Sequence, residues 1–154
     1  SKIGSLPEPV ETDLKEVMEH VIDYMDRRTS NKVQMIRDFP DADIRVKINA
    51  SLFEWVIENL SKNAVDAMGG EGKITLKMWE EPRKAVIEVT DTGKGIRKKD
   101  LRNVFRPGFT TKKRGWGLGL SLAKRIVEEY HKGRIWVKWS EVGVGTIFRI
   151  ELKK

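Results

Sequence analysis

The chain has 154 residues, 39% of them hydrophobic and 34% charged, which suits a single soluble domain with a core of its own. The absence of cysteine excludes a disulfide framework, a thiol nucleophile and a cysteine-based metal site, and the two histidines lack ligand-like spacing. No apolar run approaches the roughly 18–20 residues of a membrane span and no signal peptide opens the chain, so we expect a cytoplasmic domain without direct membrane contact, whose parent protein can still be anchored in the cell membrane.

The formal net charge of +7 is concentrated in one segment. Residues 97–114 hold eight basic side chains and one acidic one, so the remainder of the chain is neutral. Such a run is commonly a solvated loop, but between two glycine clusters it also fits a basic cover for bound phosphate. A duplex-binding face would spread its basic residues along a stripe with base-reading groups, so we expect no nucleic-acid partner.

The start of the chain differs in character from the rest. Residues 1–11 contain two prolines and little periodicity, which indicates a linker from an upstream domain. Thr12 is the expected cap of a helix over residues 13–27, whose apolar side chains recur at helical spacing. The folded domain is therefore expected over residues 12–154.

The next elements are two strands and a long helix. Alternating side chains over 33–38 and 44–48 predict two strands joined by a turn at Pro40-Asp41. Helical periodicity predicts a second helix over 51–68, which ends at two glycines.

The second half of the chain mixes strands and helices in the same way. The patterns predict strands over 73–80 and 84–91, a short helix over 97–103, an irregular loop over 104–116, a helix over 118–131, and strands over 134–139 and 146–152. Because these elements lack regular βαβ alternation, we expect an α+β fold. Its architecture should be a two-layer α/β sandwich, with a mixed and mostly antiparallel sheet packed against three helices.

Three polar residues, Asn59, Asn63 and Asp66, lie along one edge of the apolar face of the second predicted helix. Amides beside a core are costly to bury without partners, so the asparagines are either satisfied structural groups or functional ones. In the functional interpretation, Asn63 offers its carbonyl oxygen to a hard cation such as Mg²⁺. This helix alone leaves both interpretations open.

Asp91 ends a predicted strand and precedes Gly93 and Gly95. A carboxylate there can accept a hydrogen bond from an exocyclic amine such as N6 of adenine, although an aspartate before glycine is also a common turn residue. A later Gly-x-Gly-x-Gly run over 115–119 opens a helix, where free backbone N–H groups suit an anion. The strand-first context of a dinucleotide fingerprint is missing, and no Gly-Lys-Ser/Thr phosphate loop is present.

Each signal is weak by itself, but their order along the chain is specific. The chain resembles the ATP-binding catalytic domain of sensor histidine kinases, and more broadly the Bergerat-fold superfamily that they share with DNA gyrase B, the Hsp90 chaperones and MutL. The motifs that carry this resemblance are Asn59-x-x-x-Asn63, Asp91-Thr-Gly-Lys-Gly95, Phe105-x-Pro-x-Phe109-Thr-Thr-Lys, Gly115-x-Gly-Leu-Gly-Leu120 and Gly143-x-Gly-Thr-x-Phe148. The resemblance covers about residues 49–151, and the segment 59–68 looks most like the nitrogen-regulator branch of these kinases.

The resemblance implies that the domain binds ATP and Mg²⁺. Asn63 would bind Mg²⁺, with Asn59 one turn earlier near the phosphates. Asp91 would recognise adenine N6, directly and through a water shared with Thr146. Gly93 and Gly95 would let the backbone approach the base, and the apolar wall of the pocket would be Ile96.

The same resemblance assigns the phosphate side of the site. Backbone amides of the second glycine motif would bind the phosphates, from Gly115, Gly117, Leu118, Gly119 and Leu120. A flexible lid, expected to be mobile without nucleotide over 104–116, would include Phe105, Phe109, Thr110, Thr111 and Lys112. The candidate contacts to the β- and γ-phosphates are Lys112, Lys113 and Arg114.

The chain departs from the family pattern at several positions. Arg106 and Gly108 replace a glutamate and a phenylalanine that are frequent in the lid, which affects its packing and flexibility. Asp66 stands where many members have a basic residue, so that phosphate contact must come from the lid or be absent. Trp116 is bulky between two glycines, where small residues are usual.

The resemblance favours phosphoryl transfer over hydrolysis. Superfamily ATPases place a water-activating glutamate four residues before the Mg²⁺-binding asparagine, where this chain has Asn59, and an amide cannot take a proton at neutral pH. Glu58 points about 100° away around the helix. Neither His20 nor His131 has the context of a phosphoacceptor, and both are interpreted as structural or capping residues.

Two functional hypotheses follow from this resemblance. The first is the catalytic domain of a histidine kinase, which transfers the γ-phosphoryl group of ATP to a histidine on a separate dimerisation and phosphotransfer domain of the same protein, with a response regulator receiver domain as the further partner. The second is a non-catalytic nucleotide-sensing module of the same fold, in which the departures have removed productive transfer.

Overall fold

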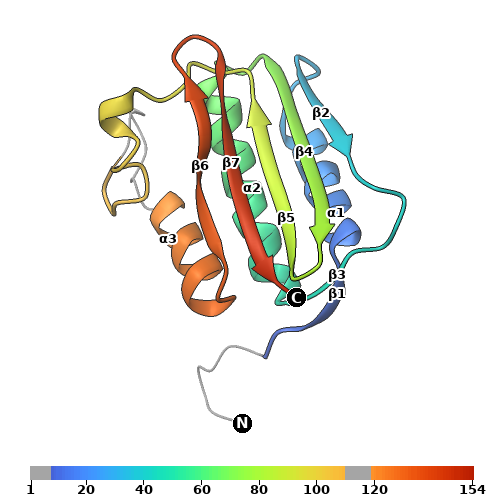
Figure 1. Cartoon of the computed structure of the whole chain (residues 1–154). Helices are drawn as coiled ribbons and strands as arrows, with labels where there is room; N and C mark the ends of the chain where they lie inside the picture. Colours follow the sequence, from blue (N-terminus) through green and yellow to red (C-terminus); the bar gives the residue numbers. More distant parts are fainter. Residues whose placement is uncertain (1–7, 110–118) are drawn as a thin grey trace.

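A five-stranded sheet forms one layer of the computed structural model, which describes residues 8–109 and 119–154 (Figure 1). Its strand order is β2-β4-β5-β7-β6, with β2 parallel to β4 and the other neighbours antiparallel. The strands are β2 (Val33–Asp38), β4 (Gly72–Glu81), β5 (Lys84–Asp91), β6 (Arg134–Glu141) and β7 (Gly145–Lys153). A separate antiparallel pair is formed by β1 (Val10–Asp13) and β3 (Arg45–Ile48).

The helices cover one face of this sheet and leave the other face open (Figure 1). Helices α1 (Leu14–Arg28) and α2 (Ala50–Ala67) pack side by side, and α3 (Gly119–Arg125) continues directly into the π-helical turn η2 (Ile126–Tyr130). A single 3₁₀ turn, η1, spans Lys98–Asp100. The predicted α+β two-layer sandwich with a mixed sheet is confirmed.

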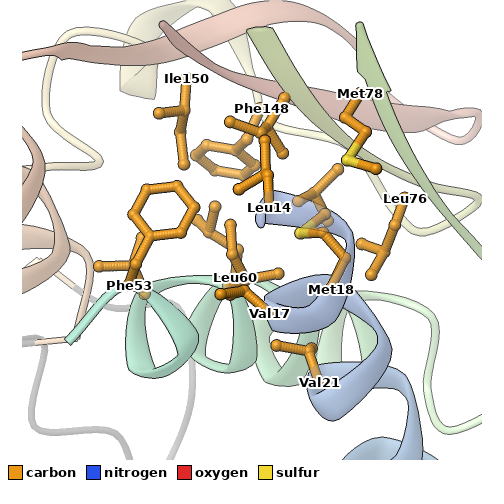
Figure 2. Close-up of a cluster of buried hydrophobic side chains, with 14 of the residues drawn as sticks. Leu14, Val17, Met18, Val21, Phe53, Leu60, Leu76, Met78, Phe148 and Ile150 are labelled. Atoms are coloured by element: carbon orange, nitrogen blue, oxygen red, sulfur yellow. The ribbon is translucent and has the colours of Figure 1, made fainter. Parts of the chain in front are cut away.

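Apolar residues at helical and alternating spacing meet between the two layers (Figure 2). The inward stripe of α1 is fully buried because its residues recur every three or four positions, and β4, β5 and β7 contribute every second side chain. Full burial of one such side chain stabilises the fold by about 1.5–3 kcal/mol. Prominent members of this core are Leu14, Val17, Met18, Val21, Phe53, Leu60, Leu76, Met78, Phe148 and Ile150.

The predicted hairpin between residues 33–38 and 44–48 is wrong. Both segments are strands, but β2 pairs with β4 and β3 pairs with β1, so the turn region at Pro40-Asp41 joins two different sheets. Residues 10 and 11 were expected in a linker and lie in β1. This strand is short and shows no alternation of burial, so periodicity could not reveal it.

The start of the first helix also differs from the prediction. Asp13, and not Thr12, is the N-cap of α1, because its Oδ1 accepts a hydrogen bond from the Lys15 amide at 3.0 Å. The Thr12 hydroxyl instead donates to the Val10 carbonyl oxygen. The boundaries of the other predicted elements agree to within one or two residues, except that the short helix over 97–103 is reduced to η1 and the end of the third helix is π-helical.

Candidate functional site

Asp91 is the last residue of β5 and lies opposite Thr146 of β7. Both side chains are buried, Asp91 with 6% of its surface exposed. Burial raises the pKa of the Asp91 carboxyl, and hydrogen bonds from the backbone amides of Gly93 and Thr146 oppose this rise. The Gly93 amide donates to Oδ1 of Asp91 at 2.8 Å. The carboxylate is thus a fixed hydrogen-bond acceptor at one end of the sheet.

The loop that follows Asp91 is held against both neighbouring elements. The Lys94 amide donates to the carbonyl oxygen of Ala67 at the end of α2, at 2.9 Å, and the Lys94 carbonyl accepts from Gly143 in the β6–β7 hairpin, at 2.8 Å. A Cβ on Gly93 would lie 2.7 Å from the Ala67 backbone. Gly95 has a φ of +76°, and a Cβ there would overlap the backbone of Glu141. Glycine is therefore required at both positions by packing within the protein itself.

Asn59, on α2, lies next to the first residue of α3. A Cβ on Gly119 would be 2.7 Å from Nδ2 and 2.8 Å from Oδ1 of Asn59. The Nδ2 atom is buried and has no hydrogen-bond partner among the residues that the structure describes. Asn63 follows one turn later on α2 and is half-buried. The structure thus brings Asn59 of α2 to the start of α3.

These groups define the metal chemistry that the site can support. Within residues 8–109 and 119–154, no group of three or more acidic, histidine or cysteine side chains is placed to hold a metal ion. An amide oxygen such as that of Asn63 is a single hard ligand, so a magnesium ion there would need phosphate oxygens and waters to complete its coordination. The donor set fits a metal ion that arrives together with a phosphate ligand.

The apolar residues predicted for the site pack near it. Ile96, Phe105 and Leu120 are partly buried against the main core. The ring of Phe105 stands edge-on to Phe148 at a centroid separation of 6.0 Å, and the Lys124 ammonium lies 5.3 Å from the Phe105 ring centroid. Phe105 therefore ties the segment after η1 to the sheet and to α3.

Part of the predicted site lies outside the described residues. Phe109 is described and half-buried. The segment 110–118 is not, so the predictions for the second half of the lid and most of the second glycine motif have no structural counterpart here. The residues concerned are Thr110, Thr111, Lys112, Lys113, Arg114, Gly115, Gly117 and Leu118.

Sequence reasoning missed Ser140, in β6. Its Oγ accepts a hydrogen bond from the Ile96 amide at 2.8 Å and lies 2.8 Å from the Thr146 hydroxyl. A lone serine in a strand carries no motif. The available signal was the break in alternation within the predicted strand over 134–139, which precedes it.

His131 is a structural residue, as predicted. Its Nε2 accepts a hydrogen bond from the Asn49 amide at 3.1 Å, and its Nδ1 lies 3.0 Å from the Ile126 carbonyl oxygen, which fixes the tautomer with a proton on Nδ1. Burial lowers the pKa of His131, opposed by the bond to Ile126. The neutral ring therefore joins the start of α2 to the π-helical turn. His20 is exposed, with Nδ1 3.5 Å from Glu54.

The fold and the residues at this end of the sheet define an ATPase-type domain. The chain belongs to the histidine kinase-, DNA gyrase B-, and HSP90-like ATPase family, whose model matches residues 48–154.

Within this family, the similarity is to sensor histidine kinases. The chain is 34% identical over 142 residues to the sensor histidine kinase ZraS of Salmonella typhi, and 34% identical over 145 residues to sporulation kinase E of Bacillus subtilis (strain 168). These alignments cover 91% and 92% of this chain but only 30% and 19% of the two relatives. The chain thus spans less than a third of their length.

Solved structures agree with this placement. The catalytic domain of the histidine kinase ThkA superposes with a TM-score of 0.86 at 29% identity, covering 97% of each chain. ThkA in complex with the response regulator protein TrrA gives a TM-score of 0.81 at 27% identity, covering 95% of this chain and 42% of that one. The sequence-based resemblance to histidine kinase catalytic domains is confirmed. Among the described residues, no helix has both the length and the apolar character needed to cross a membrane.

Proposed function

We propose that this chain is the catalytic domain of a sensor histidine kinase, which binds ATP with Mg²⁺ and directs the γ-phosphoryl group to a histidine on a separate dimerisation domain. The observation that carries the proposal is the buried Asp91 carboxylate, held by the amides of Gly93 and Thr146 at the end of the central strand β5. A charged acceptor fixed in this way suits an exocyclic amine, so Asp91 would select adenine, with Ile96 as an apolar wall.

The phosphate side of the proposed site lies between α2 and α3. Asn59 and the backbone at Gly119 meet there, and Asn63 would supply an amide oxygen to Mg²⁺. The metal ion would neutralise charge on the phosphates, which is the main requirement of phosphoryl transfer. The further phosphate contacts are assigned to Gly115, Gly117, Leu118, Leu120, and the lid residues Thr110, Thr111, Lys112, Lys113 and Arg114.

Asn59 makes rapid hydrolysis unfavourable in this proposal. An amide four residues before Asn63 cannot act as a general base towards water. Burial raises the pKa of Glu58, whose charged neighbours Lys62, Glu54 and Arg28 are on α1 and α2. Any base must then come from the phosphoacceptor domain.

The remaining assignments concern the parent protein. The fold that begins with β1 at Val10 would form the catalytic domain, and the residues before β1 would join it to the dimerisation domain. A receiver domain of a response regulator would be the second partner, in line with the complex between ThkA and its response regulator. Such a domain would act in the cytoplasm, where ATP is supplied.

Calorimetry of a non-hydrolysable ATP analogue with Mg²⁺ tests the nucleotide site. Asp91→Asn removes the charge of the acceptor and should weaken binding about 10- to 100-fold, as expected for a hydrogen bond to a charged group. Asp23→Asn, on the exposed side of α1, is the matched control and should bind normally. Equal affinities of all three proteins would reject the assignment of Asp91.

A second experiment tests the transfer. The chain is mixed with ATP labelled at the γ-phosphorus and a dimerisation domain supplied as a separate protein, and acid-labile phosphohistidine is measured. Its appearance supports the kinase. Nucleotide binding without any transfer would support the nucleotide-sensing module instead, in which Arg106, Gly108 and Asp66 have removed productive phosphorylation.

A further inference from the structure

Three polar side chains from three neighbouring strands form one row beside the proposed adenine site. In the sheet register, Ser140 of β6 lies opposite Thr146 of β7, and Thr146 lies opposite Asp91 of β5. Directly paired residues of neighbouring strands project to the same face of a sheet. Asp91 and Thr146 share the core-facing side with Phe148 and Ile150, so Ser140 is on this side as well.

A β-bulge places Ser140 in the row. The pairing of β6 with β7 shifts between Val137, opposite Phe148, and Trp139, opposite Ile147, so that Lys138 is an extra residue. Strict alternation from the buried Ile135 through Val137 would have turned Trp139 inward and Ser140 outward. The extra residue reverses this parity, and Trp139 is accordingly exposed.

The contacts of the Ser140 hydroxyl determine where its proton lies. A hydroxyl has one proton to donate and two lone pairs to accept with. Oγ of Ser140 accepts from the Ile96 amide at 2.8 Å, and lies 3.1 Å from the Gly145 carbonyl oxygen and 2.8 Å from the Thr146 hydroxyl. A carbonyl oxygen only accepts, so the Ser140 hydroxyl must donate its proton to the Gly145 carbonyl oxygen.

It follows that the contact between the two hydroxyls has one direction. The Ser140 hydroxyl donates its one proton to the Gly145 carbonyl oxygen and uses one lone pair to accept from the Ile96 amide. It can therefore only accept from the Thr146 hydroxyl. All three contacts are hydrogen bonds in this arrangement and in no other. The Thr146 hydroxyl then has no proton left to offer, and it can serve the space beside Asp91 only as an acceptor.

We infer that Ser140 is a positioning and specificity residue that fixes the Thr146 hydroxyl as a second acceptor beside Asp91, and so favours purines with an exocyclic amine over those with a carbonyl at the same position. This inference rests on the proposed function, because it takes the base to lie at Asp91. Ser140 also anchors the amide of Ile96, the proposed apolar wall, so one side chain sets both the position of the loop and the polarity of the acceptor pair.

The test compares Mg-ATP with Mg-ITP, whose hypoxanthine base has a carbonyl oxygen in place of the amine. Calorimetry on the 154-residue chain gives the ratio of the two affinities. Ser140→Ala frees the Thr146 proton to donate to the carbonyl, so the preference for ATP should fall roughly fivefold, the effect of one neutral hydrogen bond. Ser140→Thr keeps a hydroxyl and should retain the preference.

Ser61→Ala is the matched control. Ser61 is a fully buried serine on α2 whose Oγ has no hydrogen-bond partner among the described residues, so the same chemical change there should leave the ratio unaltered. A purely structural role for Ser140 would weaken ATP and ITP by the same factor and leave the ratio unchanged. An ATP-to-ITP affinity ratio in Ser140→Ala equal to that of the unaltered chain therefore overturns the inference, while the proposed function stands.

Two further outcomes are decisive. If the unaltered chain binds neither nucleotide or does not prefer ATP, the proposed function fails and this inference fails with it. If Ser140→Ala no longer unfolds cooperatively, Thr146→Val carries the test, because it removes the oriented hydroxyl and keeps the bond from Ile96 to Ser140. A lowered ATP preference in Thr146→Val supports the inference, and an unchanged preference overturns it.

Discussion

The contact between Asn59 and Gly119 should make two substitutions strongly non-additive. In Gly119→Ala the new Cβ would lie 2.7 Å from Nδ2 and 2.8 Å from Oδ1 of Asn59, whereas ordinary contacts are 3.4–4 Å. One of the two residues must therefore shift. Nδ2 of Asn59 is buried, so its amide has little room in which to turn.

The expected magnitudes follow from this overlap. Overpacking of this kind costs about 1–3 kcal/mol, so Gly119→Ala alone should lower the free energy of unfolding by about 2 kcal/mol. In an Asn59→Ala background the amide is gone and the Cβ occupies its space. Gly119 is not among the glycines with positive φ, so alanine there restricts the unfolded chain at no backbone strain, which is worth about 0.4–1 kcal/mol, and the same substitution should become stabilising. The sign of its effect reverses.

The assay is urea unfolding of the four proteins of a double-mutant cycle, without nucleotide. We expect a coupling energy of about 2 kcal/mol or more, which corresponds to roughly 4–8 °C in the melting temperature of a chain of this size. Gly70→Ala is the control, because its φ is +83° but a Cβ there meets nothing within 4 Å. It should be additive with Asn59→Ala. Additivity of the Gly119 pair to within about 0.5 kcal/mol would refute the contact.

Two further predictions concern a pH effect and the metal ion. Burial lowers the pKa of His131, so the unfolded chain takes up the proton first and the free energy of unfolding should fall as the pH drops below about 6.5. Urea unfolding between about pH 5.5 and 7.5 should show this decline in the unaltered chain but not in His131→Phe, and equal slopes would contradict it. Asn63→Ala should lose the part of nucleotide affinity that Mg²⁺ adds, while Ser61→Ala keeps it. Calorimetry with and without Mg²⁺ measures this difference, and equal losses of Asn63→Ala under both conditions would exclude metal binding by that amide.

Local pattern predicted most of the secondary structure because most of it is decided locally. The apolar stripe of α2 and the alternation of β5 match the periodicities of a helix and a strand, and their bounds agree closely with the structure. Which strands pair with each other is not decided locally. β2 and β3 are only a short turn apart in sequence, yet each pairs with a distant strand, because pairing depends on where α1 and α2 place the chain. Local sequence favoured a hairpin of these two strands, but tertiary packing pairs each with another strand.

The site shows the same division at the level of single residues. Asp91 and its glycines were recognisable because a carboxylate and two Cβ-free positions form a compact motif. Their structural reason was not recognisable, since Gly93 is required by Ala67 and Gly95 by Glu141, from elements distant in sequence. Ser140 carried no motif of its own, and its inward orientation depends on one inserted residue in β6, because a one-residue shift in register reverses every side chain after it.

The order of the motifs is informative for a topological reason. The recognised residues lie on different elements: the asparagines on α2, Asp91 at the end of β5, Gly119 at the start of α3, and Thr146 on β7. None of these elements can form the site alone: the pairing of β5 with β7 sets Asp91 beside Thr146, and the packing of α3 against α2 sets Gly119 beside Asn59. Random sequences produce any one motif often. They rarely produce all of them in the order that brings a carboxylate, an amide and the start of a helix together in one fold, and this is why the set identified the fold when no member could.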